Sequence, residues 1–162
     1  MSTASVAAAS IPALAAELMD EYVELIDTDR LEDWIELFTE DATYQVLPRE
    51  NLEHKLPASL MLCTSKNMLR DRIVSLRNAN LYNPHYDRHF VSAVRLQAVE
   101  EGLWEMRANY AVYQTNLEGH SRLFSIGGYR DKLCFDGGRL RFREKIVIVD
   151  TFAVPSMLAT PL

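Results

Sequence analysis

The segment NPHYDRH, at residues 83–89, contains residue types that bind iron or zinc in proteins. His85, Asp87 and His89 form the two-histidine, one-carboxylate set that holds a non-haem iron. If the segment is extended, these side chains share one face, but the two histidine Cα atoms are about 13 Å apart at roughly 3.3 Å per residue. That distance is too long for both histidines to bind one ion. If the segment is instead a helix capped by Asn83, its histidines at positions i and i+4 reach one ion.

A helical metal site at this segment has little further sequence support. The glutamate of the HExxH pattern is missing, and the other histidines, His54 and His120, have no ligand pattern around them. The competing interpretation is a joint between a helix and a sheet, in which the His, Asp and Arg side chains of residues 83–89 satisfy one another's hydrogen bonds.

Acid–base chemistry is another use for this segment. A pocket that brings histidine, aspartate and tyrosine side chains together can transfer protons to and from a small substrate. The chain has no GxGxxG, GxxxxGK[ST] or GxSxG motif, so the sequence gives no support for nucleotide binding or acyl transfer. The residues available for an acid–base set are Tyr44, Tyr86, Asp87, His89 and Tyr110.

Basic residues crowd the neighbourhood of this segment. Arg70, Arg72, Arg77 and Arg88 lie within a short stretch of an acidic protein. Arginine binds carboxylates through two parallel hydrogen bonds. The stretch is therefore either a solvated face or a docking surface for a partner that carries carboxylates.

Composition limits the class of protein. The length of 162 residues, 48% of them hydrophobic, predicts a single domain over residues 11–162. The Ala-rich start MSTASVAAAS lacks the basic and long apolar regions of a secretory signal, so residues 1–10 are predicted to be a disordered N-terminal tail. The net charge of -6 argues against binding nucleic acid. No run of about 18 apolar residues is present, so no membrane-spanning segment is predicted. Cys63 and Cys134 form no CxxC pair, which favours free thiols in a reducing cytoplasm.

Apolar residues at helical spacing predict three helices in the first half of the chain. Ser10 is the predicted N-cap of the first helix, and Asp29 with Glu32 forms a capping-box-like start for the second. A turn at residues 39–41 leads into a strand over residues 42–47.

The third helix is predicted to begin after an N-cap at Ser65 and to fade by Asn80. Its spacing places Lys66 outward and four apolar residues inward, namely Met68, Leu69, Ile73 and Leu76.

From Phe90 onward the hydrophobic period changes to two, which predicts a long antiparallel meander. Gly127 and Gly128 predict a bulge or a sharp bend in its third strand. Helices followed by consecutive strands favour the α+β class, with a strongly curved antiparallel sheet wrapped around the helices. The predicted strands cover residues 90–99, 103–115, 122–135 and 139–149.

An ordered set of segments resembles the small (beta) subunit of Rieske-type aromatic-ring-hydroxylating oxygenases, particularly those of the terephthalate, anthranilate and salicylate systems. The segments are LEDWIELFTEDATYQV at residues 31–46, MLRDRIVSLRNANLYNPHYDRHFVS at residues 68–92, LRFREKIVIVDT at residues 140–151 and the final MLATPL. The resemblance covers nearly all of the chain after about residue 12, and its specificity comes from the order of the segments rather than from any one of them.

The resemblance implies a nuclear-transport-factor-2-like (cystatin-like) cone and a non-catalytic structural subunit, without catalytic, cofactor-binding or metal-binding residues of its own. In such oxygenases the large (alpha) subunit carries a Rieske [2Fe–2S] cluster on CxH and CxxH motifs and a mononuclear non-haem iron. This chain has neither motif, because Thr64 and Ser65 follow Cys63, and Phe135 and Asp136 follow Cys134.

The partners implied are a large subunit, in a hetero-hexamer of three alpha and three beta chains, and other copies of the small subunit. A ferredoxin or reductase would be reached only through the complex, and the substrate would be an aromatic carboxylate such as salicylate. Residues that match the family in a polar stretch are expected at the partner interface, namely Arg70, Arg77, Tyr86, Asp87 and Arg88.

Two other hypotheses fit the same fold, since one fold supports many functions. The first is a stand-alone isomerase or dehydratase that uses the His/Asp/Tyr set. The second is a ligand-binding or dimerisation module. A deep pocket containing Asp87 and His89 would favour the enzyme, and a pocket without titratable groups would favour the binding module.

Overall fold

The computed structural model describes residues 3–79, 84–151 and 158–162. It confirms the α+β class, with helices first and a long meander afterwards. The helices are α1 (Thr3–Asp27), α2 (Leu31–Trp34), the 3-10 helix η1 (Ile35–Leu37), α3 (Arg49–Glu53) and α4 (Lys66–Asn78). The strands are β1 (Phe38–Pro48), β2 (Met61–Cys63), β3 (His85–Glu100), β4 (Leu103–Asn116), β5 (Ser121–Asp136) and β6 (Arg139–Val149).

All six strands form one sheet in the order β2-β1-β6-β5-β4-β3. The predicted antiparallel meander from β3 to β6 is confirmed. The prediction of a wholly antiparallel sheet is wrong at one place, because β1 pairs with β6 in the parallel direction. These two strands are far apart along the chain, and no tight turn joins them to impose an antiparallel pairing.

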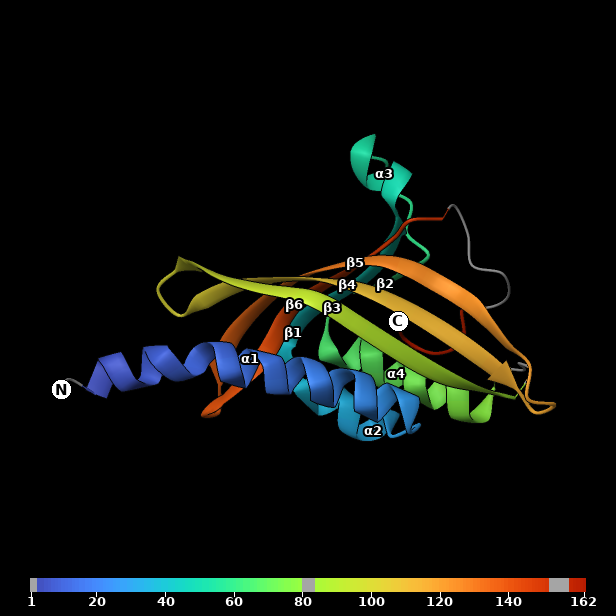
Figure 1. The fold of residues 1–162 in the computed structure, drawn as a ribbon, viewed down its shortest axis with the longest axis horizontal. Helices are drawn as coiled ribbons and strands as arrows, with labels where there is room; N and C mark the ends of the chain where they lie inside the picture. Colours follow the sequence, from blue (N-terminus) through green and yellow to red (C-terminus); the bar gives the residue numbers. More distant parts are fainter. Residues whose placement is uncertain (1–2, 80–83, 152–157) are drawn as a thin grey trace.

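The sheet covers α1, α2 and α4 on one side, whereas α3 stands beyond its other side (Figure 1). The side that faces α1 and α4 is called the inner face here, and the opposite side the outer face. The core lies on the inner face, where aromatic rings meet edge to face: Tyr22 and Phe142 are 5.4 Å apart between ring centroids, and Trp34 and Tyr44 are 5.6 Å apart. Each such pair adds about 0.5–1.5 kcal/mol beyond its buried area.

A buried ion pair lies within this core. The Lys145 ammonium is 3.0 Å from an Asp131 carboxylate oxygen, and both side chains are fully buried. The same ammonium lies 3.6 Å from the centroid of the Tyr129 ring and 4.2 Å from that of Tyr22. Burial raises the pKa of Asp131 to about 6, with Lys145 acting against that rise, and burial lowers the pKa of Lys145. Both charges therefore depend on each other and on the rings for stabilisation.

Two predicted helix starts differ from the structure. Helix α1 begins at Thr3, so the predicted N-cap at Ser10 is wrong and residues 3–10 are helical where a tail was expected. Alanine has the highest helix propensity, which lets this Ala-rich stretch extend the helix. The capping box at α2 is also wrong, because Asp29 has a left-handed backbone (φ 58°) and its carboxylate accepts a hydrogen bond from Arg77.

The predicted turn at residues 39–41 is part of β1, whose register against β6 shifts between Phe38 and Thr43. A strand interrupted in this way bends without ending.

The Ser65 N-cap of α4 is confirmed, since its hydroxyl accepts a hydrogen bond from the Met68 amide at 3.3 Å. The predicted orientations of two residues in this helix are wrong. Met68 is 42% exposed, whereas Lys66 is buried with its ammonium 2.8 Å from Glu36. The ion pair allows the lysine stem to pack inward.

The irregularity predicted in β5 has two parts. Its bulge lies at Phe124, because Val112 pairs with Ser125 and Tyr113 pairs with Leu123. Gly127 permits a close approach of two backbones, since a Cβ atom there would lie 1.9 Å from the carbonyl oxygen of Ile148.

Candidate functional site

The described part of the NPHYDRH segment is extended, because β3 begins at His85. The helical alternative is therefore wrong, and Asn83, its proposed cap, lies outside the described residues. Alternation along β3 places His85, Asp87 and His89 on the inner face.

His89 is held by helix α1. Its ring is fully buried, Nδ1 lies 2.6 Å from the Asp27 carboxylate, and its backbone amide donates to the other oxygen of Asp27 at 2.9 Å. The ring Nε2 is buried and has no hydrogen-bond partner among the described residues. The Asp27 carboxylate thus fixes both the backbone and the ring of His89 against the last turn of α1.

Asp87 is held by the C-terminal segment. Its Oδ2 accepts a hydrogen bond from the Thr160 hydroxyl at 2.8 Å, and its Oδ1 lies 3.4 Å from Nε2 of His85. Burial alone would raise the pKa of Asp87, but the contacts with His85 and Thr160 outweigh it and hold the pKa below its usual value. Asp87 is therefore stabilised in its ionised form by the groups that surround it.

These contacts form a joint between α1, β3 and residues 158–162. The predicted joint of mutually bonded His and Asp side chains agrees with this geometry, but Arg88 is not part of it, since it is exposed on the outer face. Among residues 3–79, 84–151 and 158–162, no three His, Cys, Asp or Glu side chains come together in a way that could hold a metal ion.

The proposed acid–base set is divided, because Tyr86 and Asp87 line one hollow with His85 and Asp27, whereas Tyr44 and Tyr110 lie in the core. Tyr86 is 65% exposed on the outer face, whereas Tyr44 and Tyr110 are buried on the inner face. Tyr110 shares a hydrogen bond of 2.8 Å with Ser125, and burial raises its pKa well above the usual value.

The C-terminal segment fills the inner face near Tyr44. Leu162 is 1% exposed, its amide donates to the Tyr44 hydroxyl at 3.0 Å, and its main-chain oxygen accepts from Tyr22 and Tyr44. The chain's own residues therefore occupy the place where tyrosine hydroxyls would otherwise meet a ligand.

The five residues expected at a partner interface fall in three places. On α4, Arg77 binds Asp29 and Glu32 at 2.7 and 2.9 Å, and Arg70 lies 3.8 Å from Glu36. Asp87 is buried, and Tyr86 and Arg88 are exposed on the outer face. The structure thus divides this set between the helix side, the interior and the outer face.

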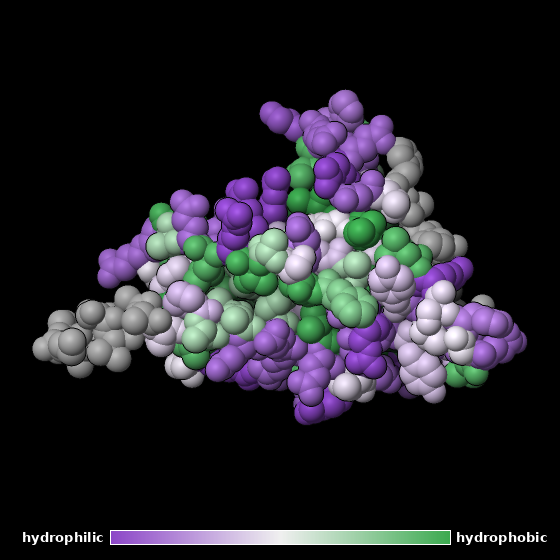
Figure 2. Space-filling view, viewed as in Figure 1, coloured by the Kyte–Doolittle hydropathy of each residue, from purple (hydrophilic) through white to green (hydrophobic). Residues whose placement is uncertain are grey.

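The outer face carries an apolar patch that the sequence analysis did not identify. Its members are exposed by 40% to 59% and lie on β3, β4 and β5. Two of the rings meet edge to face with centroids 5.8 Å apart. Hydrophobic surface runs across the middle of the molecule, between hydrophilic margins (Figure 2). The patch consists of Phe90, Tyr113, Leu123 and Ile126. Contiguous exposed apolar surface of this kind is typical of protein–protein contacts.

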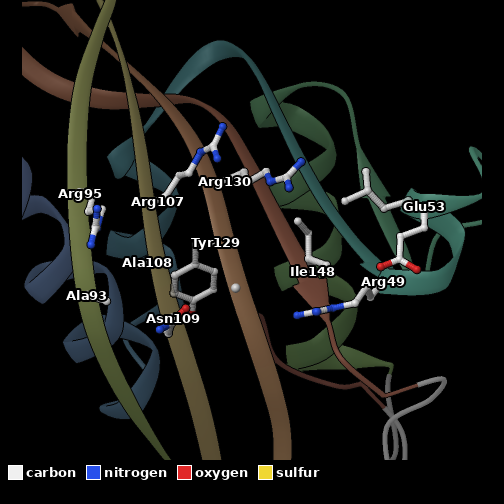
Figure 3. A pocket seen from close by; sticks show the side chains of 12 residues that line it. Arg49, Glu53, Ala93, Arg95, Arg107, Ala108, Asn109, Tyr129, Arg130 and Ile148 are labelled. Atoms are coloured by element: carbon white, nitrogen blue, oxygen red, sulfur yellow. The ribbon is translucent and has the colours of Figure 1, made fainter.

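An arginine ladder lies next to this patch. Arg95 on β3 is directly opposite Arg107 on β4, which is directly opposite Arg130 on β5. Figure 3 shows the three side chains on neighbouring strands, with Arg49 and Glu53 across a hollow of about 510 Å³. Alternation along each strand could have shown that these arginines point outward, but only the strand register brings them together.

A family model for the ring hydroxylating beta subunit matches residues 21–156. The chain belongs to the ring-hydroxylating beta subunit family. The matched range contains the whole six-stranded sheet, and with it the Asp27–His89 joint and the arginine ladder.

Relatives of this beta subunit come from aromatic-ring dioxygenases. The chain is 43% identical over 145 residues to the small subunit of anthranilate 1,2-dioxygenase from Burkholderia cepacia, covering 90% of each chain. It is 32% identical over 141 residues to a beta subunit of the terephthalate 1,2-dioxygenase terminal oxygenase from Comamonas, covering 87% of this chain and 92% of that one.

A solved structure from Novosphingobium aromaticivorans, named as the beta subunit of an aromatic-ring-hydroxylating dioxygenase, superimposes on this beta subunit with a TM-score of 0.87. It is 37% identical and covers 96% of this chain and 99% of its own. This structure and a second solved structure of similar fold confirm the predicted nuclear-transport-factor-2-like cone. No helix in the described ranges is long and apolar enough to cross a membrane.

Proposed function

We propose that this beta subunit is a structural, non-catalytic component that supports the large subunit of an aromatic-ring-hydroxylating dioxygenase. The observation that supports this most directly is the use of the Asp27, Asp87 and His89 side chains. Each is engaged in the joint between α1, β3 and the C-terminal segment, and the buried tyrosines of the predicted acid–base set, Tyr44 and Tyr110, bond to Leu162 and Ser125 instead. A buried joint of this kind stabilises a cone rather than transferring protons.

The cofactors are proposed to belong to the large subunit. A Rieske cluster needs two cysteines and two histidines in CxH and CxxH motifs, and the residues around Cys63 and Cys134 do not fit that need. Burial raises the pKa of both thiols, which disfavours the thiolate that ligates iron. In the complex, the [2Fe–2S] cluster and the mononuclear iron would therefore be held outside this chain.

The proposed substrate of the complex is an aromatic carboxylate such as salicylate. The relatives described above are subunits of enzymes named for anthranilate and terephthalate, which are both aromatic carboxylates. The large subunit would bind the substrate, because the described interior of this chain is filled by its own side chains.

The proposed assembly contains three large and three small subunits in the cytoplasm, with electrons from a ferredoxin or reductase entering only through the large subunit. A large subunit as partner follows from the family, since the relatives are small or beta subunits of multi-component dioxygenases. The exposed apolar patch on the outer face offers surface for such contacts.

The test is to express the chain alone and together with a large oxygenase subunit encoded beside it. Size-exclusion chromatography with light scattering would give the masses, and iron analysis would locate the metal. We expect an iron-free chain that joins an iron-bearing complex of hexamer mass. Iron bound to the isolated chain, or a chain that never associates with the large subunit, would contradict the proposal. In the second case, a stand-alone isomerase or dehydratase would become the better hypothesis.

A further inference from the structure

Residues 158–162 lie inside the cone although they belong to none of its helices or strands. Segments without regular secondary structure usually run over the protein surface. Here, in contrast, Ala159 and Leu162 are only 5% and 1% exposed and belong to the core cluster. These five residues are called the C-terminal plug below. The plug takes up interior volume that the helices and the sheet do not fill.

Two tyrosine hydroxyls hold the main chain of Leu162. Its amide donates to the Tyr44 hydroxyl at 3.0 Å, and its main-chain oxygen accepts from Tyr44 at 3.2 Å and from Tyr22. Burial raises the pKa of both tyrosines well above the usual value, so both hydroxyls keep their protons at neutral pH and remain donors. Side chains from α1 and β1 therefore hold Leu162 in the way that a pocket holds a ligand, through a few polar groups in apolar surroundings.

A half-buried arginine binds the other end of the plug. The Arg72 guanidinium on α4 donates to the main-chain oxygen of Leu158 at 3.3 Å. Among residues 3–79, 84–151 and 158–162, Arg72 forms no ion pair. Its charge also acts on the Tyr44 hydroxyl, where it opposes the effect of burial on the pKa. A partly buried guanidinium that bonds to a neutral carbonyl would be matched better by a carboxylate.

The tyrosines that hold the plug belong to an aromatic cluster. The ring centroid of Trp34 lies 5.9 Å from that of Tyr22 and 5.6 Å from that of Tyr44. The indole N–H of Trp34 is buried and has no hydrogen-bond partner within the described part of the chain. Flat rings together with hydroxyl and indole donors suit a ligand that combines an aromatic body with acceptor oxygens.

We propose that the interior of this beta subunit is a binding site for a small aromatic carboxylate, and that the C-terminal plug is its intramolecular occupant. The carboxylate of the ligand would accept from Tyr22 and Tyr44 in place of the main-chain oxygen of Leu162. The aromatic ring would take the place of the Leu162 side chain, and Arg72 would supply positive charge. The inference goes beyond the structural role and concerns the chain by itself, so its test needs no large subunit.

Ligand and plug compete for the same hydroxyls, so each weakens the binding of the other by the same factor. A ligand that needs a rarely populated open state binds with an apparent affinity reduced by the open fraction. Loosening the plug should therefore strengthen ligand binding, and the ligand should release the plug. The plug can be loosened without shortening the chain at Leu162 and at Thr160, whose hydroxyl donates to Asp87 at 2.8 Å.

The first measurement uses the wild-type chain. Hydrogen exchange of the Leu162 amide is followed with increasing benzoate at constant ionic strength, with benzamide as the uncharged match. We expect benzoate to speed the exchange of this amide, because it displaces the plug from Tyr44, and benzamide to have a smaller effect. Exchange that is unchanged or slower at every benzoate concentration would overturn the inference, since a ligand bound elsewhere does not release the plug. An equal effect of benzamide would contradict the assignment of a carboxylate.

The second measurement compares variants of the full chain by calorimetric titration with benzoate. The loosened variant, Thr160→Val with Leu162→Gly, lacks one hydrogen bond and the buried side chain of the plug. It should bind benzoate at least about tenfold more tightly than the wild-type chain. A synthetic peptide with the sequence LATPL of residues 158–162 should compete with benzoate for this variant. A folded loosened variant that binds benzoate no more tightly than wild type would overturn the inference.

Two further substitutions in the loosened variant test the site itself. Tyr44→Phe removes a hydroxyl and Arg72→Gln removes the charge, and each should weaken benzoate binding at least about tenfold. The matched controls, Tyr113→Phe and Arg88→Gln, change exposed residues of the outer face and should leave the affinity unchanged. Site variants that bind like their controls would contradict the proposal. Circular dichroism shows which variants are folded, and the exchange measurement on the wild-type chain decides the question if the loosened variant is not.

The two proposals fail separately. If benzoate neither releases the plug nor binds the loosened variant more tightly, the structural role stands, because assembly with the large subunit tests that role. If the chain binds benzoate as expected but never joins a large subunit, the binding site stands and the structural role is wrong.

Discussion

The two faces of strand β3 differ in whether their polar residues have partners within the chain. On the inner face, Asp87 and His89 are buried and bonded to Thr160 and Asp27. On the outer face, Arg95 has no ion pair within the described ranges and lies in a row of like charges. The residue types that suggest chemistry thus serve the fold, whereas arginines without any catalytic pattern remain available to a partner.

The largest loss of stability is expected when the buried ion pair on the inner face is broken. Replacing Asp131 by Ala leaves the Lys145 ammonium buried without its partner, which should lower the free energy of unfolding by about 3–5 kcal/mol. The matched outer-face change, Arg95→Ala, should stay within about 0.5 kcal/mol of wild type, as exposed substitutions usually do. Urea unfolding of both variants measures the contrast, and equal losses would abolish the distinction between the faces.

Breaking the joint at His89 should cost less stability than breaking the buried ion pair. In Asp27→Ala, the backbone amide and the ring of His89 lose their carboxylate partner, which should cost about 1–3 kcal/mol of stability. His89→Ala and Asp87→Ala should likewise reduce folding or the yield of the complex with the large subunit. Turnover per bound iron in the assembled complex should be unchanged for all three variants. Normal assembly with reduced turnover would instead give these residues a role in catalysis.

The pH dependence of stability tests whether the ionised form of Asp87 stabilises the fold. Its pKa is lower in the folded chain than the usual carboxyl value, so its ionised form stabilises the fold at pH values above that usual value. The contribution is lost as the pH falls through the lowered pKa. In Asp87→Asn, this part of the acid-induced loss of stability should be absent. Thermal unfolding between pH 2 and pH 7 compares the two chains, and identical slopes below about pH 4 would contradict the assignment.

The smallest effect on stability is expected in the apolar patch. Phe90 is 59% exposed, so Phe90→Ser should change the free energy of unfolding by no more than about 0.5 kcal/mol. The same substitution should weaken association of the chain with other subunits. A large loss of stability would show that the patch belongs to the core of the isolated fold rather than to an interface.

Short-range sequence patterns predicted the strands and helix ends that depend on residues close together in the chain. The alternation between residues 139 and 149 gave β6 with its observed limits, and Ser65 caps α4 as expected. Apolar spacing also gave the α+β class. The resemblance, carried by segments spread along the chain, predicted the family that the comparisons confirmed.

Features that depend on pairing between distant residues were not predictable. The parallel contact of β1 with β6 and the position of the bulge at Phe124 are set by tertiary packing. The arginine ladder depends on the register of three strands, which a one-residue slip would destroy. For the same reason, the five residues expected at one interface could not be recognised from sequence as lying in three different places.

The parallel pairing of β1 with β6 has a consequence for how the chain folds. Phe38 is opposite Phe142, so two neighbouring strands of the sheet come from distant parts of the chain. Contacts of such long sequence separation slow folding, because the loop between them must close before any pairing energy is gained. During synthesis, β1 emerges long before β6 and has an unpaired edge until β6 is made. Assembly with other subunits therefore has to wait until β6 has paired with β1.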